Sequence, residues 1–122
     1  MEERTLTITL NPDWRAALRA AGARAKADTY QGETLNFESV GALFARLTER
    51  RWSLVRALMG AGELSVRELA RRLGRDVKRV HEEVTALAQL GLVERTERGG
   101  VLCPYVNIHV DLQLNAEPRQ VA

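Results

Sequence analysis

Residues 63–100 have the sequence ELSVRELARRLGRDVKRVHEEVTALAQLGLVERTERGG, and this stretch decides the fold. Ser65 is placed to cap a helix, and Glu68 is placed to bond back to the Ser65 backbone. Gly74 is suited to close this helix, because glycine tolerates the left-handed conformation with which many helices end. Asp76 is a good cap for a second helix. We therefore expect two helices joined by a tight turn.

The second helix and the residues after it complete a recognisable pattern. Its apolar positions fall three and four residues apart on one face, namely Val77, Val80, Val84 and Leu87. Gly91 is expected to end this helix, and residues 92–95 and 101–102 predict two short strands joined by a glycine-containing loop. The order of helix, turn, helix and hairpin predicts a winged helix-turn-helix. An arbitrary helical hairpin followed by a β-ribbon is the alternative.

A strand and a helix are expected near the N-terminus. Residues 5–10 alternate threonine with leucine or isoleucine, which predicts a half-buried strand. Asn11 or Asp13 can cap the following helix, whose apolar side is rich in alanine. Such a helix buries little area alone, so we expect it to pack on another element or on a second subunit. Residues 27–37 predict a loop that ends in a short extended segment.

Two more helices are expected before the central motif. Ser39 can cap a short helix, and the helical pattern restarts at Thr48. The second of these helices is expected to be the first of a three-helix core, with a buried face formed by Trp52, Val55, Leu58 and Met59. Trp52 is in phase with the other apolar positions, so we assign it to core or dimer packing rather than to base stacking.

The C-terminal part predicts one long strand. Residues 106–114 alternate strictly between apolar and polar, and a lone strand of this kind can neither bury its apolar face nor satisfy its edge. We expect it to pair with residues 5–10, either within one subunit or across a dimer. The tail from residue 116 to 122 is expected to fray.

The expected fold class is α+β. It comprises a winged helix-turn-helix with a three-helix core and a β-wing, an added N-terminal strand and helix, and a long C-terminal strand. We divide the chain into an N-terminal extension at 1–38 with a possible role in dimerisation, a DNA-binding domain at 39–103, and a C-terminal strand and tail at 104–122.

Composition excludes several classes of protein. The chain has 122 residues, of which 45% are hydrophobic and 28% charged, a profile typical of a folded globular domain. No signal peptide or membrane-spanning run is expected, so we place the protein in the cytoplasm. One cysteine and two histidines leave too few ligands for a zinc site, and no metal or cofactor is expected. Signatures of nucleotide binding or hydrolysis are missing, so we do not expect an enzyme.

Positive charge is concentrated in the central motif. The net charge of the whole chain is only +2, but residues 67–79 contain six basic and two acidic residues, which gives 6 − 2 = +4. A charge run is often just a solvated face, yet here it coincides with a predicted DNA-binding motif. We therefore expect double-stranded DNA as a partner.

Helical geometry assigns roles to the residues of this motif. Lys78, Glu82 and Thr85 are expected on the outward face of the second helix, opposite Val80, and Arg79 is expected just beside them. These four are the predicted base-reading residues. The predicted phosphate-binding residues are Ser65, Arg67, Arg71, Arg72 and Arg75. Arg98 is expected at the tip of the wing. Glu83 lies four residues after Arg79 and is expected to pair with it along the helix.

Four stretches of the chain resemble a family of prokaryotic transcriptional regulators. They are YQGE at 30–33, LTERRW at 47–52, SVRELARRLGRDVKRVH at 65–81 and PYVNIHVD at 104–111. The family consists of MarR-like winged-helix proteins that are often described as antitoxin-like. The resemblance covers residues 30–114 and implies a DNA-binding repressor that is encoded beside a toxin whose activity it blocks.

Two hypotheses of function follow. The first is a homodimeric transcriptional repressor that binds an inverted repeat, with its two recognition helices about one DNA turn (~34 Å) apart. The second is an antitoxin-type interaction module that neutralises a partner toxin, which Glu82 and Glu83 on the second helix favour. A small-molecule sensor is a weaker third option, because nothing in the sequence identifies a pocket.

Overall fold

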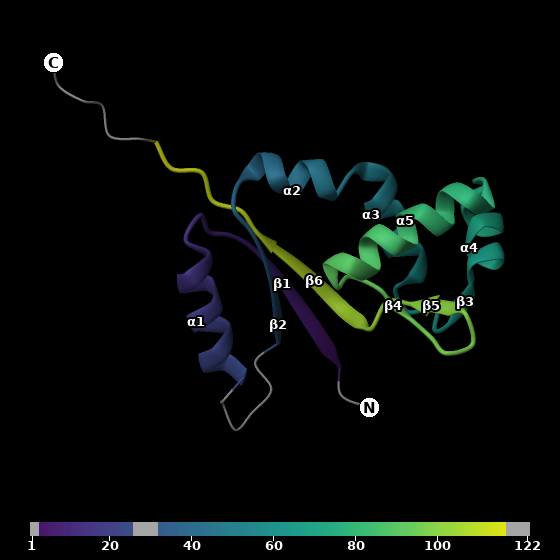
Figure 1. Cartoon of the computed structure of the whole chain (residues 1–122), viewed down its shortest axis with the longest axis horizontal. Coiled ribbons are helices and arrows are strands. Elements are labelled where there is room, and N and C mark those ends of the chain that lie inside the picture. The colour runs from purple at the N-terminus through teal and green to yellow at the C-terminus, as the bar shows by residue number, and fades with distance from the viewer. Residues whose placement is uncertain (1–2, 26–31, 117–122) are drawn as a thin grey trace, which may run out of the picture.

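The computed structural model describes residues 3–25 and 32–116 and has the expected α+β composition (Figure 1). The helices are α1 (Trp14–Ala25), α2 (Val40–Arg46), α3 (Glu49–Leu58), α4 (Val66–Leu73) and α5 (Val77–Leu90). The strands are β1 (Arg4–Leu10), β2 (Glu33–Phe37), β3 (Leu64–Ser65), β4 (Glu94–Arg95), β5 (Gly100–Leu102) and β6 (Tyr105–Asp111). The parts of the predicted loop and tail at 27–31 and 117–122 lie outside the described residues.

The central strand of the larger sheet is β1. The strand order is β2-β1-β6, and β1 runs parallel to both neighbours. Ile8 is level with Leu35 of β2 and with Val110 of β6, and paired residues of neighbouring strands share a face. One face of the sheet is therefore apolar and the other carries threonine, asparagine and histidine. The expected pairing of the N- and C-terminal strands is confirmed, and it forms within one chain.

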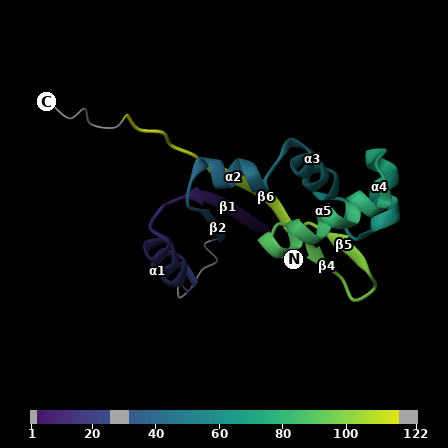
Figure 2. The same ribbon diagram turned by 45° about the horizontal axis from the view of Figure 1, so that its top comes forward.

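Helix α1 connects β1 to β2. The sequence indicated β2 only as a short extended segment. Parallel neighbours require a long crossover, and α1 provides it. The polar side chains help to fix the pair, because Thr9 Oγ1 donates to Asn36 Oδ1 at 2.8 Å. Helix α1 packs against β2 but leaves Leu18 62% exposed. It lies at the opposite end of the molecule from α4 in both views (Figures 1 and 2).

The helices between the two sheets begin at the expected residues. Ser39 Oγ accepts from the Ala42 amide at 3.0 Å and starts α2. Thr48 Oγ1 accepts from the Arg51 amide at 3.3 Å and starts α3. Each bond satisfies one of the amides that a helix start leaves without an intrahelical partner.

The second sheet is antiparallel and has the order β3-β5-β4. The hairpin of β4 and β5 matches the two short strands expected after α5, whereas β3 was not anticipated. Thr96 fixes the hairpin loop, since its hydroxyl donates to Glu63 Oε1 at 2.9 Å and accepts from the Gly100 amide at 2.9 Å. The hairpin is thereby attached to the residues that precede α4.

A single hydrophobic core joins the parts of the chain. Leu6 and Ile8 of β1 belong to the same buried cluster as Leu54 of α3, Leu69 of α4 and Leu87 of α5. All three segments into which we divided the sequence contribute residues to it. Among the described residues, no helix combines the length and the apolar character that crossing a membrane requires.

Candidate nucleic-acid interface

The turn between α4 and α5 has the geometry that the sequence predicted. Gly74 adopts φ 64° and closes α4 in the left-handed conformation. The amide of Arg75 donates back to the Ala70 carbonyl at 3.0 Å. Asp76 then starts α5, because its carboxylate accepts from the Arg79 amide at 3.2 Å. The start and the direction of α5 are therefore fixed by local hydrogen bonds.

The face of α5 that points away from the core carries the predicted base-reading residues. Val80, Val84 and Leu87 are buried, while Lys78, Arg79 and Glu82 are exposed. Three of the four predicted side chains are thus available on one surface of a well-supported helix. This arrangement leaves two cations and one carboxylate open to a ligand.

Thr85, the fourth predicted base-reading residue, is already engaged. Its hydroxyl donates to the His81 carbonyl at 3.0 Å and accepts a hydrogen bond from the Arg95 guanidinium. Arg95 belongs to β4, so this contact holds a cation of the hairpin beside α5. Arg98, the residue predicted at the tip of the hairpin, is exposed in the loop between β4 and β5.

The predicted phosphate-binding residues in α4 and at its start differ in whether their side chains already have hydrogen-bond partners. Ser65 uses its hydroxyl to cap α4, where Oγ accepts from the Glu68 amide at 3.0 Å. Arg67 is exposed. Arg71 and Arg72 both donate to Glu68, with Arg71 Nη2 lying 2.5 Å and Arg72 Nε 3.0 Å from Oε1. One carboxylate therefore offsets part of the charge of two predicted DNA contacts.

The expected bond from Glu68 back to Ser65 is wrong. The Ser65 backbone belongs to β3 and pairs with Gly100 of β5, and the Glu68 carboxylate turns instead toward Arg71 and Arg72. The hydrogen bonds from Arg71 and then Arg72 hold the pKa of Glu68 at about 2, below its usual value of 4.5. Glu68 therefore stays ionised in acid that would protonate a free glutamate.

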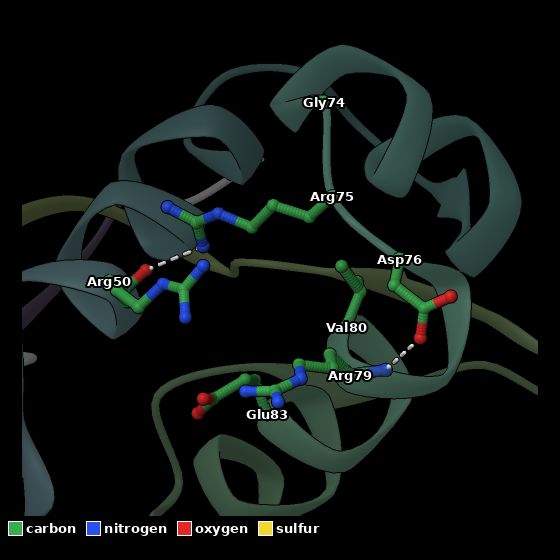
Figure 3. A pocket seen from close by; sticks show the side chains of 7 residues that line it. All are labelled: Arg50, Gly74, Arg75, Asp76, Arg79, Val80 and Glu83. Carbon is green, nitrogen blue, oxygen red and sulfur yellow. Dashed lines mark hydrogen bonds between the residues drawn. The ribbon is translucent and has the colours of Figure 1, made fainter.

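A cavity of about 270 Å³ lies beside the start of α5 (Figure 3). Its lining comes from α3, from the turn between α4 and α5, and from α5, and consists of Arg50, Gly74, Arg75, Asp76, Arg79, Val80 and Glu83. Arg75 Nη1 donates to the Arg50 carbonyl at 3.0 Å. The guanidinium groups of Arg50 and Arg75 lie next to each other in Figure 3, and Arg79 extends along the opposite wall. Three cations thus surround one small cavity.

The expected pair between Arg79 and Glu83 is also wrong. Glu83 forms its ion pair with Arg51 of α3, and the Nε to Oε2 distance is 2.6 Å. This contact ties the start of α3 to the middle of α5. Arg79 remains exposed and is available to the cavity.

Two cations beside α5 were not anticipated from the sequence. Arg50 approaches from α3 and Arg95 from β4, so the surface is wider than the two-helix motif. Arg50 lies 25 residues before its partner Arg75, and no local pattern indicates that contact. The number of basic residues outside the motif was the only available signal. In the described part of the chain, no group of three or more His, Cys, Asp or Glu residues is arranged to hold a metal ion.

The comparisons with known proteins give a family. Residues 46–110 match the model of the HVO_A0114 family, and because they make up just over half of the chain, the protein belongs to this family. The matched region runs from the end of α2 into β6 and leaves β1, α1 and β2 outside it. No curated protein and no solved structure matches the chain significantly.

Proposed function

We propose that the protein is a transcriptional regulator of the MarR-like winged helix-turn-helix type, which represses by binding an inverted repeat of DNA as a homodimer. The observation that carries this proposal is the exposed outer face of α5, where Lys78 and Arg79 lie on a helix whose opposite side is buried. In the proposed fold, α3, α4 and α5 are the three-helix core, the β4–β5 hairpin is the wing and α5 is the recognition helix.

In this proposal some of the charged side chains around α5 contact bases and others contact phosphates. Lys78 and Arg79 contact guanine edges in the major groove, and Glu82 accepts from cytosine. Arg50 and Arg75 converge on the cavity beside α5 and bind one backbone phosphate there. Arg95 bonds to Thr85, so both sit between the recognition helix and the wing and contact the sugar-phosphate backbone rather than a base. Arg67 and Arg98 are exposed for further phosphate contacts.

The phosphate site can be tested separately from base recognition. A R50A/R75A variant is expected to bind the DNA upstream of its own gene more weakly and with a shallower dependence on salt. Each lost phosphate contact lowers the slope of log K against log salt by about 0.9. Because both arginines are assigned to one phosphate, the expected change is about 0.9 per subunit. The control is R15A/R19A in α1, which removes the same charge at the opposite end of the molecule.

The measurement is fluorescence anisotropy of a labelled promoter fragment at several salt concentrations. A slope that is the same for R50A/R75A and for wild type would refute the phosphate site. A wild-type protein that binds the promoter no better than random DNA of the same length would refute the regulator proposal as a whole.

A second candidate function is an antitoxin-type interaction module. The observation that favours it is Leu18, which is 62% exposed on α1, the helix that lies at the opposite end of the molecule from α4 (Figure 1). In this case α1 binds a partner toxin through an apolar contact. The product of the adjacent gene should then co-purify with wild type and not with L18E. Co-purification that persists in L18E excludes α1 as the binding site.

A further inference from the structure

The outer edge of β6 has no neighbouring strand among the described residues. In the order β2-β1-β6, one side of β6 pairs with β1 and the other side is open. An open edge presents backbone N–H and C=O groups to any strand that fits. Most edge strands are protected by several charges or by proline, but residues 106–114 contain one acidic side chain, Asp111, one histidine, His109, and no proline.

Apolar exposure is concentrated along the same segment. Seven large apolar side chains are exposed in the described part of the chain, and four of them lie between residues 106 and 114. They are Val106 at 50%, Val110 at 39%, Leu112 at 37% and Leu114 at 75%. The last two lie beyond Asp111, where pairing with β1 ends. The apolar alternation therefore continues past the strand that supports it.

The geometry of a strand limits how a second copy can dock here. Alternate residues of β6 direct their backbone groups to the open edge, so two copies related by a twofold axis match only when the axis passes through a residue. Three positions of the axis leave most of residues 106–114 paired, namely His109, Val110 and Asp111. The side chains decide between them, because directly opposite residues share a face and lie about 5 Å apart.

We propose that the open edge of β6 pairs antiparallel with β6 of a second copy of this chain, with the twofold axis at Val110. His109 then lies opposite the partner's Asp111, and this pair occurs twice. An imidazole N–H can donate to the carboxylate in either protonation state of the histidine. On the apolar face, Val106 is opposite the partner's Leu114 and Ile108 is opposite the partner's Leu112. Residues 112–114 thereby gain the backbone partners that β1 does not provide.

The other two positions of the axis are less favourable. An axis at His109 places that histidine opposite its own copy and leaves Asp111 facing an asparagine. An axis at Asp111 places two carboxylates opposite each other. All three axes match apolar with apolar residues, and only the axis at Val110 places His109 opposite a carboxylate. The β2-β1-β6 sheets of the two copies then form one continuous sheet of six strands.

This dimer goes beyond the proposed function, because it supplies an interface for a homodimer and is measured without DNA. Light scattering after size-exclusion chromatography is expected to give a dimer for wild type. V110E places two carboxylates at the twofold axis and is expected to raise the dimer dissociation constant at least tenfold. L18E adds the same charge at another exposed apolar position and should remain dimeric. A wild-type protein that is monomeric at 100 µM would overturn the proposal, as would a folded V110E that dimerises like wild type.

A charge exchange tests the register and uses only exposed polar positions. H109D alone opposes two carboxylates, and D111H alone opposes two imidazoles, so both are expected to weaken the dimer. The double variant H109D/D111H restores opposite partners across the axis and should recover most of the association. Additive losses in the double variant would overturn the proposed register.

Disulfide cross-linking tests the position of the twofold axis independently. In a C103A background, V110C places two thiols opposite each other at a separation that a disulfide can span. Oxidised glutathione should then link C103A/V110C into a covalent dimer. C103A/H109C should link much more slowly, because its thiol faces the partner's Asp111. The reverse order of rates would place the axis at His109 and overturn the proposal.

Discussion

Gly74 determines how α5 leaves α4. Its φ of 64° lies in the left-handed region, which costs an L-amino acid with a side chain about 1–2 kcal/mol. A Cβ added at Gly74 would meet no heavy atom within 4 Å, so the whole penalty of a side chain there comes from the backbone. A Cβ added at Gly22 in α1 would also have free space around it, but the φ of Gly22 is not positive. The same substitution is therefore expected to have opposite effects at the two sites.

We expect G74A to lower the free energy of unfolding by about 1 kcal/mol, because alanine must adopt the left-handed conformation. We expect G22A to raise it by about 0.5–1 kcal/mol, because alanine is the better residue within a helix. Urea unfolding of the two variants and wild type measures both values. Changes of the same sign in the two variants would contradict the assignment of either backbone conformation.

At this scale the sequence predicts the helix caps well and the partners of charged side chains poorly. The caps at Ser39, Ser65 and Asp76 follow from residues within three positions of each other, and all three are confirmed. The partner of Glu83 was wrong, because its carboxylate reaches Arg51, 32 residues earlier in the chain. No spacing rule within a helix describes a contact between two helices.

The positive charge of helix α4 is partly neutralised by Glu68. Its exposed side carries three arginines, and Glu68 accepts from two of them, Arg71 and Arg72. The helix thus has fewer free cations than its sequence indicates. In the proposed complex with DNA, phosphates compete with Glu68 for both guanidinium groups.

We therefore expect E68Q to bind promoter DNA more tightly at low salt. Each arginine that gains a phosphate contact steepens the slope of log K against log salt by about 0.9. The control is E38Q, which removes the same charge between β2 and α2. Anisotropy titrations at several salt concentrations measure both slopes. Equal affinities for E68Q and E38Q would show that the loss of charge alone, rather than the release of these arginines, changes binding.

The Glu68 carboxylate also makes the stability of the protein depend on pH. Arg71 and then Arg72 hold the pKa of Glu68 at about 2 in the folded protein, compared with 4.5 in the unfolded chain. The stabilisation is therefore fully present above pH 4.5 and is lost as the pH falls toward 2. Melting temperatures measured from pH 7 to pH 2 should separate wild type from E68Q above pH 4.5 and converge at the acid end. A constant separation across this range would exclude the ion pair as its cause.

The helices were easier to predict than the strands. The five helices of residues 3–25 and 32–116 carry their signal in their own apolar spacing and capping residues, and each occurs where the sequence placed it. Strand β3 has two residues and is defined only by its pairing with β5, so nothing in its own sequence could reveal it. Strand β2 was indicated as a short extended segment, but its place beside β1 depends on the crossover through α1.

On the scale of the whole molecule, Arg4 links the two sheets. Its guanidinium lies 2.5 Å from Glu33 of β2 and 3.1 Å from Glu94 of β4. It also lies 5.2 Å from the centre of the Tyr105 ring, and the Tyr105 hydroxyl donates to the Gly91 carbonyl at 3.1 Å. One arginine of β1 thus contacts the first sheet, the hairpin and a residue bonded to the end of α5. The pKa of Arg4 is raised, chiefly by its hydrogen bond to Glu33.

The sequence could predict that the terminal strands pair but not that their sheet is joined to the hairpin. Alternation in residues 5–10 and 106–114 was sufficient for the pairing, which the structure confirms. The parallel direction and the link through Arg4 depend on the path of the whole chain. The partners of Arg4 lie 29 and 90 residues away, beyond the reach of any local pattern.

Arg4 is expected to make the two sheets unfold together. R4A removes two ion pairs and the contact with the Tyr105 ring, and should lower the free energy of unfolding by about 1–2 kcal/mol, since about a third of the side chain is exposed and solvent weakens each pair. R4K keeps the charge without the paired bonds to Glu33 and should lie between R4A and wild type. R19A, on the exposed side of α1, should change stability by less than about 0.5 kcal/mol. Urea unfolding followed by tryptophan fluorescence and by circular dichroism measures all four proteins. If the two signals still coincide in R4A and the midpoint is that of wild type, the sheets are held together by the shared core alone, and Arg4 contributes no measurable coupling between them.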